Sequence, residues 1–229
     1  MHKLVCALVL SLVTAVALPA LAQVGPTPAE AAKYQGLHAA AHQGDVARIT
    51  QLAAAKANLN ARDGNGRTPL HVATFAKQRE AIRALARAGA DLNLLDNDRY
   101  DGVTMASVAD DEDTLRVLLS LGASARQVTS RYDGTALIAA AHLGHDGVVR
   151  QLIAAGAPLD HVNNLHWTAV IESIVLGNGG ARHQATLKAL IDARANLQLK
   201  DRQGATPLQL ARTRGYGEMV KMLEAAGAR

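Results

Sequence analysis

The stretch Arg67-Thr68-Pro69-Leu70-His71-Val72 returns in altered form along a chain of 229 residues. A Gly-Ala pair, or a Lys-Ala or Arg-Ala pair in its place, closes each repeat, and these pairs follow one another after 33, 33, 34, 38 and 33 residues. A phased repeat of this period predicts an array of small units, and such arrays usually present a binding surface. The closing pairs are Lys56-Ala57, Gly89-Ala90, Gly122-Ala123, Gly156-Ala157, Arg194-Ala195 and Gly227-Ala228.

Each repeat predicts two short helices followed by a turn. Threonine opens most repeats, where its oxygen can accept a hydrogen bond from the first helical turn, and proline follows it in two of them. Asp101 can cap the helix of the third repeat in the same way. Glycines later in the repeat can end a helix in the left-handed conformation. The threonines are Thr68, Thr135, Thr168 and Thr206, the prolines are Pro69 and Pro207, and the glycines of the first helices are Gly44, Gly144, Gly177 and Gly215.

One repeat has an apolar face that it cannot cover by itself. In the fourth repeat this face consists of Val148, Val149, Leu152 and Ile153. Stacking against neighbouring units buries such a face, so we expect one continuous array.

These motifs resemble the ankyrin-repeat family. The family pattern is matched by Thr68 to His71, by Gly144-His145 and by Gly89-Ala90-Asp91, whereas Lys77 and Asp110 stand where the family has glycine. The resemblance implies an all-α solenoid of six helix-turn-helix units joined by β-hairpin loops. We expect the ankyrin-repeat domain over 34–229, with units at about 34–62, 63–95, 96–129, 130–162, 163–200 and 201–229.

The first residues have the pattern of a secretory signal peptide over 1–22. A basic start precedes an apolar run from Leu4 to Leu18, and Ala20-Leu21-Ala22 offers a cleavage site before Gln23. A retained membrane anchor is the alternative, because the apolar run is almost long enough to span a bilayer. We expect cleavage, a linker over 23–33, and a mature protein without membrane contact in the periplasm, with secretion as the alternative.

Composition limits the chemistry that the mature chain can perform. Its single cysteine, Cys6, lies in the predicted signal peptide, which excludes disulfides and thiol catalysis afterwards. The formal charge of +4 falls to +3 when Lys3 is removed, and the basic residues are scattered, so we expect no nucleic-acid partner. No nucleophile elbow or phosphate-binding glycine loop is present. A catalytic triad could be imagined from Ser130, His142 and Asp133, but none of these motifs accompanies them. We therefore expect a protein that is not an enzyme.

Five of the six aromatic residues fall where the resemblance places the concave groove of the array. The phrase Arg-Tyr-Asp-Gly also occurs twice, beginning at Arg99 and at Arg131. Aromatic residues and arginine dominate the energetics of many interfaces. The alternative is that these side chains only stiffen the hairpins. The predicted partner-binding residues are Phe75, Arg99, Tyr100, Arg131, Tyr132, His142, His166 and Trp167.

Histidine and acidic residues raise the question of metal. The resemblance gives His38 and His71 a structural role, with their rings bonded to neighbouring backbone. Two pairs have the helical spacing of metal ligands, His38 with His42 and His142 with His145, but neither has a third ligand. The acidic run from Asp110 to Asp113 predicts a helix cap, with a calcium contact or a site for a basic partner as the alternative. We expect no metal and no cofactor.

The fifth unit carries an insert of five residues, 178–182. Such a loop is either neutral or a flexible lip that carries Arg182 toward a partner.

We therefore predict a non-enzymatic protein-protein interaction module, a monomer that acts as a periplasmic scaffold or regulator and binds an exported protein through its groove. Two alternatives stay open. One is a secreted effector that binds a host or competitor protein. The other, suggested by resemblance to exported bacterial ankyrin proteins, is an accessory factor for a periplasmic enzyme, such as one of oxidative-stress defence.

Overall fold

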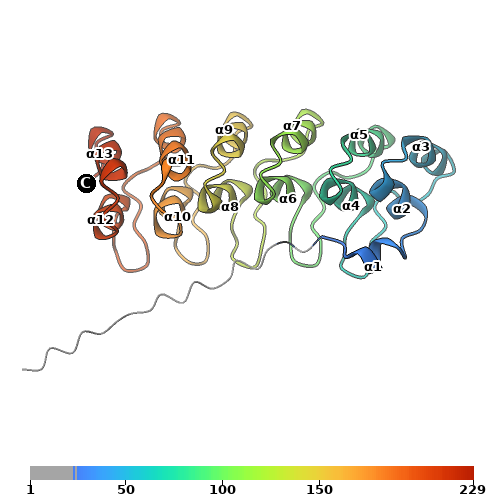
Figure 1. Cartoon of the computed structure of the whole chain (residues 1–229), viewed down its shortest axis with the longest axis horizontal. Coiled ribbons are helices and arrows are strands. Elements are labelled where there is room, and N and C mark those ends of the chain that lie inside the picture. The colour runs from blue at the N-terminus through green and yellow to red at the C-terminus, as the bar shows by residue number, and fades with distance from the viewer. Residues whose placement is uncertain (1–22, 24) are drawn as a thin grey trace, which may run out of the picture.

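The computed structural model describes residue 23 and residues 25–229, whose helices form one elongated array (Figure 1). The predicted signal peptide, residues 1–22, lies outside the described residues. None of the described helices combines the length and the apolar character that crossing a bilayer requires.

The described residues contain thirteen helices. After the short helix α1 they form six pairs, one in each predicted unit, which confirms the predicted fold class. The helices are α1 (Pro28–Ala31), α2 (Gly36–Gln43), α3 (Val46–Ala54), α4 (Pro69–Phe75), α5 (Arg79–Ala88), α6 (Gly102–Val108), α7 (Glu112–Ser120), α8 (Ala136–Leu143), α9 (Asp146–Ala154), α10 (Ala169–Val175), α11 (Ala181–Asp192), α12 (Pro207–Thr213) and α13 (Gly217–Ala225).

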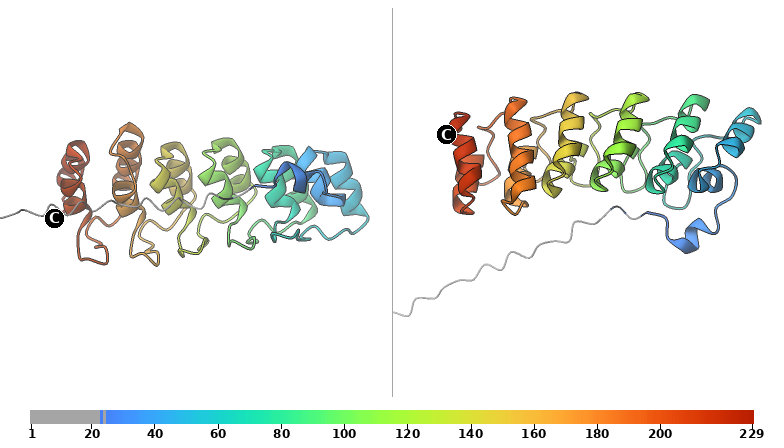
Figure 2. Two further views of the ribbon diagram at one scale, coloured as in Figure 1. Left: turned by 60° about the horizontal axis from the view of Figure 1, so that its bottom comes forward. Right: turned by 45° about the horizontal axis from the view of Figure 1, so that its top comes forward.

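The helices stand in two rows with the loops along one side (Figures 1 and 2). The first helices of the pairs, from α2 to α12, form the inner row, and the second helices, from α3 to α13, form the outer row. One continuous core runs between the rows, with Leu70, Leu118, Leu137 and Leu152 fully buried. Full burial of one such side chain is worth about 1.5–3 kcal/mol, and most of these side chains are covered partly by the adjacent unit.

The predicted helix caps are present. Thr68, Asp101, Thr135 and Thr168 each accept a hydrogen bond from the backbone amide three residues ahead. Thr206 does the same, and its own amide donates to Gln209 Oε1 at 2.9 Å. These bonds satisfy backbone groups that a short helix would otherwise leave free.

The histidines of the repeated phrase bond to neighbouring backbone, as the resemblance implies. His71 Nε2 lies 2.9 Å from the carbonyl oxygen of Leu94, and His38 Nε2 lies 2.9 Å from that of Arg67. The other ring nitrogen of His71 accepts a hydrogen bond from the amide of Thr68 at 2.9 Å. The imidazole of His71 is therefore neutral, with its proton on Nε2.

Left-handed residues end most inner helices. Gly44, Gly144 and Gly215 adopt this conformation as predicted. Lys77 (φ 55°) and Asp110 (φ 54°) also adopt it, although each has a Cβ atom. The prediction for Gly177 is wrong, because Gly177 is not left-handed and the insert alters the path of the backbone. Gly177 is still restricted to glycine, since a Cβ atom there would collide with the carbonyl oxygen of Ser173.

The insert of the fifth unit packs against its neighbours. Arg182 Nη1 and Nη2 lie 2.9 Å and 3.2 Å from the two carboxylate oxygens of Asp110, and Arg182 Nε lies 3.3 Å from Asp146. On the other side, the hydroxyl of Tyr216 donates to the carbonyl of Gly177 at 2.8 Å. Arg182 therefore joins the third, fourth and fifth units, which is neither of the two roles considered from the sequence.

The connecting loops are tight turns with little strand character. A single isolated bridge, between Thr129 and Gly134, occurs in the described residues where β-hairpins were expected. Neighbouring loops bond to each other, because the amide of Ser130 donates to the Arg99 carbonyl and that of Asn164 to the Tyr132 carbonyl, both at 2.9 Å. The loops therefore form a connected rim along the array.

Substitution of Lys77 by glycine should stabilise the protein. A left-handed conformation costs a residue with a Cβ atom about 1–2 kcal/mol, and the greater freedom of glycine in the unfolded chain offsets part of the gain. We expect Lys77→Gly to raise the thermal midpoint by about 1–3 °C in melts followed by circular dichroism. Lys77→Ala should give no rise. Asp110→Gly should give none either, because it removes the partner of Arg182; an equal rise there would contradict this role of Arg182.

The His71 ring should make stability depend on pH. Burial lowers the pKa of His71 to about 4. Because the unfolded chain binds this proton more readily, the stabilisation is complete above pH 6.5 and is lost as the pH falls toward 4, by about 3 kcal/mol in total. In the sixth unit Gln209 occupies the position of His71 and accepts from the amide of Thr206. A glutamine in His71→Gln can make the same bond to Thr68 but does not titrate, so urea unfolding of this variant should depend less on pH over that range. The same pH dependence in both proteins would disprove the assignment.

Candidate functional site

An N-terminal arm, residues Gly25–Tyr34, folds back onto the inner row. Part of the segment predicted as a linker is thus ordered as α1, which has a capping box between Thr27 and Glu30. The position of a Cβ atom on Gly25 would lie 3.1 Å from Cδ1 of Phe75, at the end of α4. Phe75, a predicted partner-binding residue, is therefore in contact with the chain's own arm.

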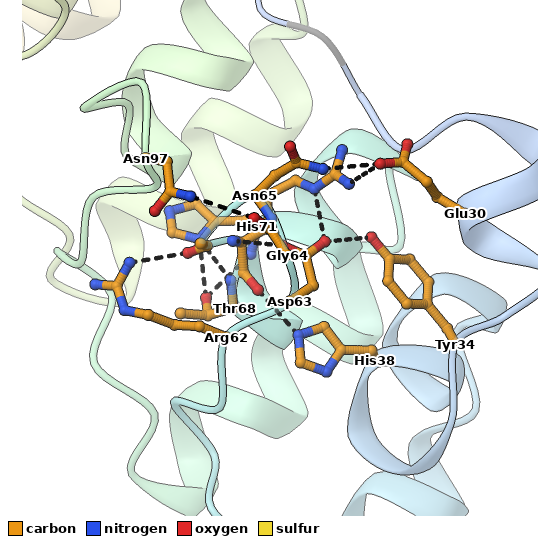
Figure 3. A network of polar contacts seen from close by, with 12 residues as sticks. Glu30, Tyr34, His38, Arg62, Asp63, Gly64, Asn65, Thr68, His71 and Asn97 are labelled. Carbon is orange, nitrogen blue, oxygen red and sulfur yellow. Dashed lines mark hydrogen bonds and ion pairs between the residues drawn. The ribbon is translucent and has the colours of Figure 1, made fainter.

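Ion pairs and hydrogen bonds hold the arm on the second unit (Figure 3). Glu30 Oε1 accepts from Arg67 Nη2 at 3.0 Å and from Asn65 Nδ2 at 2.8 Å. The hydroxyl of Tyr34 donates to Asp63 Oδ2 at 2.7 Å. The pKa of Glu30 is lowered to about 2, first by the backbone amide and the hydroxyl of Thr27 and then by Arg67. The arm thus satisfies the polar groups of this part of the inner face.

The remaining predicted loop residues lie on three successive loops. Arg99, Arg131 and His166 are exposed. Their neighbours Tyr100, Tyr132 and Trp167 are partly exposed, one on each loop. The structure therefore presents an aromatic and a basic or imidazole side chain side by side on each loop from the third to the fifth unit.

Neighbouring loops are close enough to affect each other electrostatically. The pKa of Tyr100 is raised, first by burial and then by Asp98 and Asp96, while Arg131 on the next loop opposes the rise. Arg99 Nη1 also lies 2.9 Å from Asp133 Oδ1, with about half of each side chain exposed (49% and 48%). Such an exposed pair contributes little to stability, so Arg99 remains available for other contacts.

His142, at the end of α8, faces an acidic residue that the sequence analysis did not identify. Its Nδ1 atom lies 3.6 Å from Oε2 of Glu172 on α10. The other oxygen of Glu172 accepts a hydrogen bond of 2.8 Å from Nδ2 of Asn163. Burial raises the pKa of Glu172 to about 7 and also lowers the pKa of His142. A comparison of the inner helices would have found Glu172, because the matching residues of the other units are apolar: Ala39, Val72, Met105, Ala139 and Leu210.

The described residues form neither the triad considered from the sequence nor a metal site. No hydrogen bond joins the side chains of Ser130, Asp133 and His142. Asp111 caps α7 and accepts from the amide of Thr114 at 3.1 Å, as predicted for the acidic run. Within the described part of the chain, no group of three His, Cys, Asp or Glu side chains is arranged to hold a metal ion.

Comparison with known proteins agrees with this architecture. The family pattern described as ankyrin repeats in three copies matches residues 14–96 and 103–201. The chain is similar to the ankyrin repeat protein YahD of Escherichia coli (strain K12), with 39% identity over 100 residues, which are 43% of this chain and only 50% of that relative.

Solved structures extend the similarity to most of the chain. An ankyrin repeat domain from Acinetobacter baumannii AYE is 46% identical with a TM-score of 0.79, over 84% of this chain and 98% of its own. The ankyrin repeat domain of Bcl-3, a member of the IkappaB protein family, is 26% identical with a TM-score of 0.76, over 86% of this chain and 88% of its own. Ankyrin repeats are protein-protein interaction modules, and the fold is generally non-catalytic. The chain belongs to the ankyrin-repeat family.

Proposed function

We propose that this protein is a periplasmic scaffold or regulator that holds another exported protein against its inner face. The observation that carries the proposal is the row of partly exposed aromatic residues on three successive loops, Tyr100, Tyr132 and Trp167. Rigid aromatic side chains provide large contact areas at a low cost in conformational entropy, and they are frequent among the residues that dominate binding.

The rim that carries these residues is held in place before any partner arrives. Backbone hydrogen bonds join the loops of the third, fourth and fifth units. Arg182 ties the same three units together near the start of the outer helices. Binding to a rigid surface avoids part of the entropic cost of ordering loops, which favours affinity.

The N-terminal arm limits where the partner binds. Glu30 and Gly25 already occupy the second unit, at Arg67 and Phe75. The partner therefore faces the third to fifth units, where exposed side chains have no such covering. Phe75 takes part only if the arm is displaced.

Alanine substitution of the three aromatic residues should weaken binding strongly. Removal of a central aromatic residue typically costs more than 1 kcal/mol, so Tyr100→Ala, Tyr132→Ala and Trp167→Ala together should weaken the complex by about a hundredfold. A photoreactive amino acid at Arg131 or His166, which are exposed on the same loops and unchanged in the triple variant, should capture one defined partner in living cells, and mass spectrometry should identify it. Unchanged capture by the folded triple variant would contradict the proposed surface.

The outer row provides the matched control for this experiment. Arg150 and Lys188 lie exposed on α9 and α11 of the same units. A photoreactive residue at these two positions should yield no specific product. Equal capture from both rows would indicate contact without a defined surface.

The location of the protein is tested separately. The apolar run near the start of the chain supports export. We expect the protein in the periplasmic fraction after osmotic shock, whereas Leu10→Arg should leave it in the cytoplasm. Recovery only from the culture medium would favour the secreted effector.

A further inference from the structure

Glu172 is a buried acid on an inner helix. Its side chain is 7% exposed, and burial of a carboxylate is costly unless other groups compensate for the lost hydration. The adjacent inner helices α8 and α12 pack on either side of α10 (Figure 1). A residue of this kind needs an explanation that the packing of the array does not provide.

Only one of the two carboxylate oxygens accepts a hydrogen bond from the described residues. Oε1 accepts the hydrogen bond from Asn163, and Oε2 accepts none from the described residues. His142 Nδ1 is 3.6 Å from Oε2, which is too long for a hydrogen bond. The side chain is therefore held in a fixed place while one oxygen keeps its capacity to accept.

The loop residue that holds Glu172 differs from its equivalents in a way that suits this task. Asp63, Asp96 and Asp201 occupy the matching position in three other units, where each accepts hydrogen bonds from two amides of its own loop. Asn163 also accepts from two loop amides, those of Leu165 and Trp167. Because asparagine has an NH2 group in addition, it can donate to Glu172 where an aspartate would repel it.

In the second unit, a partly buried carboxylate, that of Asp63, has both a cation and a hydroxyl group as donors. Asp63 Oδ2 accepts from Arg67 Nε at 2.8 Å and from the hydroxyl of Tyr34. In the fifth unit Trp167 replaces the arginine, and no arm supplies a donor. The carboxylate of Glu172 therefore lacks the cation that Asp63 has.

The ionisable groups close to Glu172 and His142 are histidines. His142 lies beside Glu172, and the pKa of His142 is lowered first by burial and then by His183 of α11 and His145 at the start of α9. No charged side chain of α12 is bonded to Glu172 in the described residues. The raised pKa of Glu172 agrees with a carboxylate that is short of nearby positive charge.

We propose that Glu172 is the acceptor for a lysine or arginine side chain of the protein that binds the inner face, entering beside His142 and Trp167. This inference rests on the proposed function and adds the chemistry of one subsite. A cation at Oε2 supplies the missing donor and the missing charge, and it keeps the carboxylate ionised. Binding at neutral or lower pH then releases a proton.

The test uses a capped Gly-Lys-Gly peptide as the probe and NMR of the full chain as the readout. We expect the lysine peptide to shift the signals of the Asn163 side-chain amide and the Trp167 indole, and the norleucine peptide to leave them unchanged. At pH 8, Glu172→Gln should weaken binding by about fivefold or more. Below pH 7, affinity for the wild type should fall by up to about tenfold for each pH unit, and that of the variant should not.

Two controls separate binding from folding. Glu172→Gln keeps an oxygen that can accept from Asn163, so the loop should stay in place. Glu112→Gln removes an equal charge from α7 of the outer row, where Glu112 accepts from Gln151, and should leave peptide binding unchanged. Equal binding of the lysine peptide by the wild type and Glu172→Gln, or of the lysine and norleucine peptides by the wild type, would overturn the proposal.

Failure of this subsite can be told apart from failure of the proposed function. If a photoreactive residue at Tyr132 captures the same partner equally well with and without Glu172→Gln, the subsite is wrong and the function stands. If the lysine peptide binds as expected but no partner is captured, the chemistry of Glu172 stands and the proposed function is wrong.

Discussion

Each helix pair of this array has an apolar side that only the next pair can cover, and the rest of the structure follows from this constraint. The buried leucines of one unit, such as Leu118, pack with the core of the adjacent units, and α6 contacts both α4 and α8. Because a single pair exposes too much apolar surface, stability is a property of neighbours. The threonine caps and tight turns make this stacking possible, since they satisfy the ends of helices that are only two turns long.

Polar contacts then determine how far the stack acts as one body. His38 joins α2 to the loop of the following unit, and His71 joins α4 to Leu94 at the end of its own unit, so these bonds act over short distances along the array. Arg182 is different, because it reaches an aspartate 72 residues earlier in the chain and bonds to Asp146 on the way. The exposed ion pairs themselves are weak, but their geometry opposes rotation of one unit against the next. Arg182 thus ties together the third to fifth units, which carry the partly exposed aromatic residues.

The sequence predicted what depends on local chemistry. Thr68, Thr135 and the left-handed glycines follow from groups within a few residues, so the period and the caps were sufficient. Gly177 departed from its prediction because the insert changes the path after α10, a property of one unit that the period does not contain. The pairing of Arg182 with Asp110, the docking of Glu30 on Arg67 and the burial of Glu172 all depend on residues brought together only by stacking. Comparison between units, and not the motif itself, is the route by which Glu172 would have been found.

The second and fifth units illustrate how buried polar groups of the inner face obtain partners. Around the second unit the chain supplies its own occupant, and the arm pairs Arg67 with Glu30 and Asp63 with Tyr34. Around the fifth unit the chain supplies none, and Glu172 keeps an acceptor without a donor while Trp167 stays partly exposed. An unpaired buried carboxylate reduces the stability of the free protein. Residues that reduce stability in the free protein gain most from a partner. For this reason we propose that the fifth unit, and not the more regular second unit, determines the specificity of the surface.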